Sequence, residues 1–329
     1  MNRSCSLWKP LERGADLLIA TVLALVAAVF APGIVPEASA AMPPTAISYY
    51  VQPSDTTGST SSTAYSWGCN EARSDNSHNA NSYVTLDFGA QTAGGGGTYL
   101  PGSTQYSFTN GKIENFGYWF AAGYQFCSPA HRLWVNIATN NSRRTNGELG
   151  HIWGLIVNDI ANFASSHGYS SVTIAAGNDI ESWGPYSDIN AWEWGTGGGS
   201  YAGTSGLLIS DFGSADGCPT AYHQYTDRTC AVSSPNYNWL MSKYYWVSWG
   251  WPLNIANPEI YVAAQSVQWA NISDYGKHYN DLTPIYFEGP MSATNSGLTP
   301  SQSWTSLTNA LNTEGVPSYM PYSTQIRWG

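Results

Sequence analysis

Short apolar runs rich in β-branched and aromatic residues recur along the chain from residue 83 onward, and each ends in polar residues or glycine. Runs of this length and composition predict buried strands. The clearest candidates cover residues 83–88, 133–139, 172–176, 206–210, 244–249 and 283–287. Weaker candidates are 116–121 and 324–328, and residues 259–263 fit either a strand or a loop.

Between these runs, apolar side chains recur at helical spacing. The strongest segment is 146–167, where Thr145 and Glu148 are expected to form a capping box. A second predicted helix covers 300–314, with Thr299 as its N-cap and Gly315 after its end. A third covers 264–278.

The alternation of strands and helices indicates parallel βαβ units. About eight strand candidates in about 250 residues favour an α/β fold of the closed (β/α)8 TIM type, irregular in places, over an open sheet. No GxGxxG motif follows the first strand, so a dinucleotide-binding fold is not indicated.

The first 40 residues read as a secretory signal peptide. Arg3, Lys9 and Arg13 precede an apolar run over 17–30, and small residues at 38–40 suit a signal peptidase. The apolar run is short for a membrane span, although an uncleaved anchor is the alternative. We therefore expect a secreted, extracellular protein with no membrane association after cleavage. Residues 41–66, rich in Ser, Thr and Pro, are expected to form a tail or linker, and 67–329 a single barrel domain.

Cysteine usage agrees with export. Of the five cysteines, Cys5 falls within the signal, so an even number remains and two disulfides are expected. Cys218 and Cys230 would close a short loop, and Cys69 with Cys127 then follows by elimination. No Cys/His spacing suggests a metal site, and no cofactor is implied.

The charge of the chain limits its partners. With 22 acidic against 12 basic residues, the net charge is −10, which disfavours nucleic acid and anionic lipid. Only 10% of residues are charged, whereas 14% are aromatic. Aromatic faces stack on sugar rings and short polar side chains bind hydroxyl groups, so a polysaccharide or cell-wall glycan is the expected partner of a monomer. The alternative is that this composition only stabilises an exported protein.

Carboxylates stand at the ends of several predicted strands, where a barrel gathers its catalytic groups. They are Asp87, Asp179, Glu181, Asp211 and Glu288. Asp179 and Glu181 would share one face of an extended chain, and two neighbouring carboxyls raise each other's proton affinity, as a general acid requires. Alternatively, Asp179 caps a turn and Glu181 is solvated.

If the run at 116–121 is the second strand, Glu181 follows strand 4 and Glu288 follows strand 7. This order resembles the large clan of retaining glycosidase barrels, which implies Glu181 as acid/base and Glu288 as nucleophile. The Asp-x-Glu at 179–181 also resembles the end of the chitinase motif. Ile180 stands where the first clan usually has Asn, and Gly177 where the chitinase motif has Asp. The chain is also similar to uncharacterised secreted bacterial proteins with glycosidase-like barrels.

Other side chains are candidates for holding a sugar. Trp249 and Trp251 would form a stacking platform at the end of the strand at 244–249, unless they only pack a loop. The remaining candidates for substrate binding are Trp183, Asn136, Asp211 and Asp87.

The leading hypothesis is a secreted glycoside hydrolase with a two-carboxylate mechanism acting on an extracellular or cell-wall polysaccharide. A non-catalytic barrel that binds glycan is the first alternative, and a peptidase or esterase with a spatial triad is the second. The sequence has no GxSxG or HExxH motif. It assigns no role to Glu259.

Overall fold

The computed structural model describes residues 41–56, 60–100, 106–127, 130–142, 145–198, 206–232, 237–279, 282–295 and 297–328. Residues Met42–Gly329 form one compact unit. The predicted signal peptide at 1–40 lies outside the described residues, so export stays a prediction. Within the described ranges, no helix has both the length and the apolar character needed to cross a membrane.

Eight parallel strands form the centre of this unit. They lie side by side in the order β8-β7-β6-β5-β2-β1-β10-β9, and a hairpin of β3 and β4 is attached to β2. Their bounds are Thr45–Tyr50 for β1, Ser82–Gln91 for β2, Gly97–Tyr99 for β3, Tyr106–Thr109 for β4, Leu133–Asn140 for β5, Val172–Asp179 for β6, Ile209–Asp211 for β7, Asn254–Ala256 for β8, Met291–Ala293 for β9 and Ser323–Trp328 for β10.

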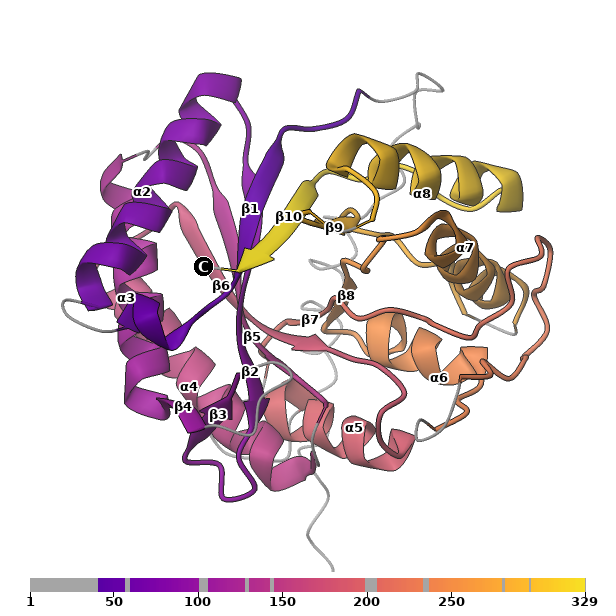
Figure 1. Cartoon of the computed structure of the whole chain (residues 1–329), viewed down its shortest axis with the longest axis horizontal. Coiled ribbons are helices and arrows are strands. Elements are labelled where there is room, and N and C mark those ends of the chain that lie inside the picture. The colour runs from indigo at the N-terminus through magenta and orange to yellow at the C-terminus, as the bar shows by residue number, and fades with distance from the viewer. Residues whose placement is uncertain are drawn as a thin grey trace, which may run out of the picture. The chain divides into compact units, whose positions relative to one another are not determined.

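Helices surround the strands on the outside (Figure 1). They are α2 (Thr60–His78), α3 (Asn110–Cys127), α4 (Gly147–Ser166), α5 (Tyr186–Glu193), α6 (Met241–Tyr245), α7 (Ala263–His278) and α8 (Pro300–Glu314), with short helical turns at Pro53–Thr56, Trp194–Gly198 and Trp246–Gly250. Every residue of β2 is buried, as expected for a parallel strand covered on both faces.

The sheet is curled around an inner cluster of side chains. Ala138, Phe212, Met291 and Ile326 pack together although they come from β5, the end of β7, β9 and β10. Strands that are not neighbours in the sheet can meet in this way only because the sheet curves back on itself. The predicted α/β class is therefore confirmed as a curled parallel sheet. Isolated parallel bridges join Ala256 to Phe287 and Glu259 to Met291, and closure into a complete barrel stays a prediction.

The predicted helices are confirmed with small shifts at their ends. In α8, Thr299 accepts a hydrogen bond from the Gln302 amide, and Gly315 ends the helix with φ of 64°. In α4, the N-cap is Asn146 and not Thr145, because the Asn146 side chain accepts from the Leu149 amide at 2.9 Å.

Several predicted strands are wrong. The run at 116–121 lies inside α3, and the run at 244–249 is helical through α6 and the turn that follows it. Most residues of both runs are apolar, including the exposed Trp119, so neither run shows the clear polar face that would distinguish a helix from a strand. The run at 283–287 forms no strand beyond the bridge at Phe287, and β9 begins only at Met291.

The predicted tail at 41–66 is also wrong. Thr45–Tyr50 is a strand between β2 and β10, and α2 begins at Thr60. A six-residue strand and a helix rich in Ser and Asn have compositions close to those of a linker, so composition alone misassigned them.

Both predicted disulfides are present. Cys69 to Cys127 joins α2 to the end of α3, and Cys218 to Cys230 braces the segment between β7 and α6.

Candidate active site

A pocket of about 360 Å³ opens where several parallel strands end. The ends of β1, β5, β6 and β10 contribute to it, together with the segment after β8. Its lining consists of Tyr50, Asn140, Ser142, Asp179, Glu181, Trp183, Glu259, Tyr261 and Trp328. This is the edge of a parallel sheet at which α/β enzymes place their catalytic groups.

Three carboxyl groups meet in this pocket. One oxygen from each of Asp179, Glu181 and Glu259 lies within 4.8 Å of the other two. Asp179 is the last residue of β6 and Glu181 follows two positions later, so the predicted clustering of these two acids is found. Glu259 lies on the segment that follows β8, the strand at one end of the sheet.

The side chain of Glu181 is held by a close approach of two loops. Gly213 packs against Ile180 so tightly that an added Cβ would lie 2.1 Å from the Ile180 carbonyl oxygen. This approach brings Ser214 to Glu181, where the serine hydroxyl donates to Oε1. Burial raises the pKa of Glu181 to about 7, against the opposing effect of the Ser214 hydrogen bond. Glu181 can therefore hold a proton near neutral pH.

Asp179 and Glu259 are more deeply buried, with 7% and 6% of their surfaces exposed. Oδ1 of Asp179 has no hydrogen-bond partner among the described residues. Glu259 Oε1 accepts from the Tyr261 hydroxyl at 2.5 Å and from the Tyr50 hydroxyl at 3.4 Å. Burial, followed by the repulsion of neighbouring carboxyls, raises the pKa of both acids well above the usual range.

No lysine or arginine lines the pocket among the residues that the structure describes. Burial, together with the repulsion of nearby carboxyl groups, raises the pKa of all three acids and so favours their protonated forms. Carboxylate oxygens this close together are also the ligands that a hard divalent cation prefers, so the same three residues are those that could hold a metal ion.

The pocket has a packed floor and aromatic walls. Tyr50 and Tyr261 rest against the inner cluster around Met291. Trp183 and Trp328 form part of the lining with 36% and 58% of their surfaces exposed, and the Trp328 ring centroid lies 4.8 Å from that of Tyr50. Two exposed indoles beside buried acids suit a ring-shaped ligand with an apolar face.

Glu288 lies elsewhere. It precedes β9 instead of following a strand, and its charge raises the pKa of Tyr83 and Tyr322, which stand at the amino-terminal ends of β2 and β10. Burial raises its own pKa to about 7. The predicted pairing of Glu288 with Glu181 at one mouth is therefore wrong, because the apolar run before Glu288 is not the strand.

Asp87 and Asp211 are fully buried behind the pocket. Asp87 accepts from the Gly89 amide at 2.6 Å, and Asp211 from the Gly213 amide at 2.9 Å and from the Ser248 hydroxyl. Burial raises the pKa of each to about 7. With 0% and 1% of their surfaces exposed, neither reaches a substrate in this structure, contrary to the prediction.

Asn136 is likewise absent from the pocket. It is 0% exposed, donates to Thr85 at 3.2 Å and accepts from the Trp134 indole at 3.1 Å. Asn140, the last residue of β5, lines the pocket in its place.

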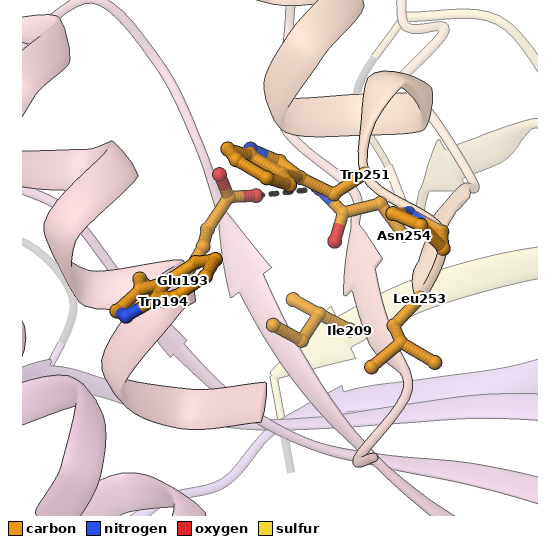
Figure 2. A pocket seen from close by; sticks show the side chains of 7 residues that line it. Glu193, Trp194, Ile209, Trp251, Leu253 and Asn254 are labelled. Carbon is orange, nitrogen blue, oxygen red and sulfur yellow. Dashed lines mark hydrogen bonds between the residues drawn. The ribbon is translucent and has the colours of Figure 1, made fainter. Parts of the chain in front are cut away.

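Trp249 and Trp251 do not form the predicted platform beside the acids. Trp249 donates to Thr283 and its ring lies near that of Tyr286. Trp251 lines a second pocket of about 250 Å³, where Glu193 accepts from Asn254 (Figure 2). Asn254 begins β8, so this pocket lies at the opposite edge of the sheet. Of the three predicted tryptophans, only Trp183 lines the acid pocket.

Most of the pocket lining was not predicted from the sequence, including Glu259, Tyr50, Tyr261 and Trp328. Glu259 and Tyr261 stand in the short Pro-Glu-Ile-Tyr segment at 258–261, whose alternation already places both side chains on one face. Tyr50 and Trp328 end strands that were missed or faint in the pattern.

The chain was compared with known proteins. No family model matches it, and neither does any curated protein. The pocket itself is therefore the feature that indicates a function.

Proposed function

We propose that this protein is a secreted glycoside hydrolase of the (β/α)8 type, in which Glu181 and Glu259 form the catalytic pair. The observation that carries the proposal is the approach of their carboxyl oxygens to within 4.8 Å in an open pocket. Retaining glycosidases hold their two carboxyl groups about 5–5.5 Å apart, and inverting enzymes hold them farther apart to admit a water. The short separation therefore favours a retaining mechanism.

The environments of the two acids suggest their roles. Glu181, with a pKa of about 7, keeps the proton that a general acid gives to the glycosidic oxygen. Glu259 accepts hydrogen bonds from Tyr261 and Tyr50, which favour its carboxylate form against the larger effect of burial. With Glu181 as the acid, Glu259 takes the role of the nucleophile.

The reaction follows in two steps. A Glu259 oxygen forms a bond to the anomeric carbon while the bond from that carbon to the leaving oxygen breaks, and the leaving oxygen takes the proton of Glu181. Glu181 then removes a proton from water, whose oxygen displaces Glu259 from the anomeric carbon. The exposed faces of Trp183 and Trp328 are placed to stack on the sugar rings that flank this bond.

Closure of the barrel belongs to the same proposal. The bridges from Ala256 to Phe287 and from Glu259 to Met291 lie between the two end strands of the curled sheet. They are the contacts through which an eight-stranded barrel would close, and Glu259 takes part in one of them.

A panel of neutral, amino and acidic polysaccharides, incubated with the exported chain, tests the proposal. Release of reducing ends should fall at least 100-fold in Glu181→Gln. Glu148→Gln, which removes an exposed acid of α4, should cleave like the wild type. If no glycan is cleaved, or if Glu181→Gln cleaves as fast as the wild type, the catalytic assignment is lost.

A non-catalytic glycan-binding protein is the second candidate. It is favoured by one observation, that burial and mutual repulsion raise the pKa of all three acids, which disfavours an ionised nucleophile at neutral pH. Saturable binding of a glycan that depends on Trp328, with no cleavage over days, would support this candidate.

A further inference from the structure

The two-carboxylate mechanism leaves one acid of the pocket unused. Asp179 is 7% exposed, lies in the same 4.8 Å cluster as the catalytic pair, and has an Oδ1 atom without a hydrogen-bond partner among the described residues. A buried polar atom without a partner is costly, and a donor supplied by a ligand would remove that cost. Asp179 lines the pocket and carries such an unpaired acceptor in the pocket wall.

Among the residues that the structure describes, no positive charge balances this third acid. No described lining residue is basic, and the hydroxyl groups of Tyr50 and Tyr261 both donate to Glu259. Carboxyls in such a place favour any ligand that carries a positive charge, since attraction between opposite charges is strong where water is excluded. They disfavour an anionic ligand for the same reason.

The aromatic side chains that line the pocket favour some positively charged ligands over others. A metal ion gains nothing from Trp183 and Trp328, whereas a sugar ring stacks on an indole face, and an ammonium group beside an indole gains a cation–π attraction. An ammonium group also offers three N–H donors, which suits a site where three carboxyl groups converge.

We infer that the pocket binds a positively charged amino sugar, with its ammonium group against Asp179 and its ring against Trp183 or Trp328. This inference deepens the proposed hydrolase function and rests on it for the role of the neighbouring acids. It names the substrate class as a glycan that contains free amino sugars, as opposed to N-acetylated, neutral or acidic ones.

Proton release gives a direct test. Because the acids of the pocket hold protons near neutral pH, an ammonium group that binds them should displace at least part of a proton into the buffer. Free glucosamine and galactosamine are suitable probes, since neither contains a glycosidic bond to cleave. N-acetylglucosamine and glucose are the matched uncharged probes.

Titration calorimetry at pH 6.5, in two buffers with different ionisation enthalpies, measures affinity and proton release together. We expect one of the two amino sugars to bind at least 10-fold more tightly than the uncharged probes, and to release protons that the uncharged probes do not. Equal affinities for the amino sugars and the uncharged probes would overturn the inference. Binding of Ca²⁺ or Mg²⁺ to the three acids without any preference for an amino sugar would also overturn it.

Asp179→Asn keeps the shape of the side chain and removes its charge. It should weaken binding of the amino sugar at least 10-fold and leave binding of N-acetylglucosamine unchanged. Asp159→Asn, which removes an exposed acid of α4, should alter neither. Loss of both affinities in a folded Asp179→Asn variant would contradict the inference. If the variant does not fold, the affinities of the wild type for the amino sugars and the uncharged probes still decide.

These outcomes separate the inference from the proposed function. Selective binding of an amino sugar without cleavage of any glycan supports the inference and removes the hydrolase assignment. Cleavage of neutral or N-acetylated glycans without preference for free amino sugars supports the hydrolase and removes the inference.

Discussion

Asn141 holds the backbone of Glu181 with both polar atoms of its side chain. Nδ2 donates to the Glu181 carbonyl oxygen at 2.6 Å, and Oδ1 accepts from the Glu181 amide at 3.1 Å. The Asn141 amide in turn donates to the Asp179 carbonyl oxygen. One buried side chain after β5 thus fixes the direction in which the acid after β6 points.

Asn141 is therefore expected to act as a positioning residue. Asn141→Ala should lower kcat about 10- to 100-fold, because a small misplacement of a catalytic group is costly, and should leave KM nearly unchanged. Steady-state kinetics on the glycan that the wild type cleaves will show this split. Asn76→Ala, which removes an exposed asparagine of α2, serves as the control and should change neither constant. A rise in KM with an unchanged kcat would contradict the positioning role.

The pairing of acids makes a second prediction. Glu259→Gln should reduce hydrolysis at least 1,000-fold, because it removes the nucleophile. Glu288→Gln should cleave at close to the wild-type rate. Glu288 lies near Tyr83, at the edge of the sheet where the strands begin, whereas the pocket lies where they end. Initial rates on one substrate suffice. The reverse ranking of the two variants would restore the pair that the sequence alone suggested.

The exposed aromatic side chains of the pocket should affect the affinity for the glycan more than the rate of its cleavage. Trp328→Ala is expected to raise KM or Kd several-fold, since stacking on an exposed aromatic ring is worth about 1 kcal/mol or slightly more. Trp119→Ala, an equally large change on an exposed part of α3, should leave binding unaffected. Identical affinities in the two variants would exclude Trp328 from the binding site.

Stability should fall as the pH rises from 5 to 8. Burial raises the pKa of Glu71, Asp87, Asp211 and Glu288 to about 7. The folded chain thus binds more protons than the unfolded chain between about pH 4 and 7, and the free energy of unfolding decreases through this window. This stability is fully present below the unfolded pKa and is lost above the folded pKa.

Urea unfolding at pH 5, 6, 7 and 8 measures the effect. Glu288→Gln should lose less stability over this range than the wild type, by on the order of 2 kcal/mol, because an uncharged amide has no proton to lose. Glu148→Gln is the matched control and should follow the wild-type profile. A free energy of unfolding that increases between pH 5 and 8 would contradict the prediction.

The sequence predicted the elements whose signals are local. The capping box of α8, the buried strand before Asp179 and both disulfides follow from a few neighbouring residues or from cysteine counting. The prediction from sequence failed where the surroundings of a segment in the folded chain decide whether that segment is a helix or a strand. The apolar run at 244–249 was predicted as a strand, yet it is helical, because a short apolar run fits either element.

The partner of Glu181 was missed for a similar reason. Two misjudged strands cancelled: β1 was overlooked and part of α3 was counted as a strand, so Glu181 still followed the fourth parallel strand. No such cancellation helped Glu288, because β9 begins at Met291, three residues after Glu288, and so follows this acid instead of preceding it. Gly177 also shows why the chitinase-like motif is incomplete, because an added Cβ there would lie 2.9 Å from that of Ala138 and leave no room for an aspartate.

Tyr50 and Trp328 close one wall of the pocket although they end β1 and β10, the first and last described strands, which pair in register. A chain that leaves the ribosome or a translocation channel amino end first cannot complete this wall until Trp328 has emerged. The ligand binding proposed for this pocket therefore depends on the last described strand. A chain cut before β10 would be unable to bind even with all three acids intact, so loss of binding would be an early sign of carboxyl-terminal trimming.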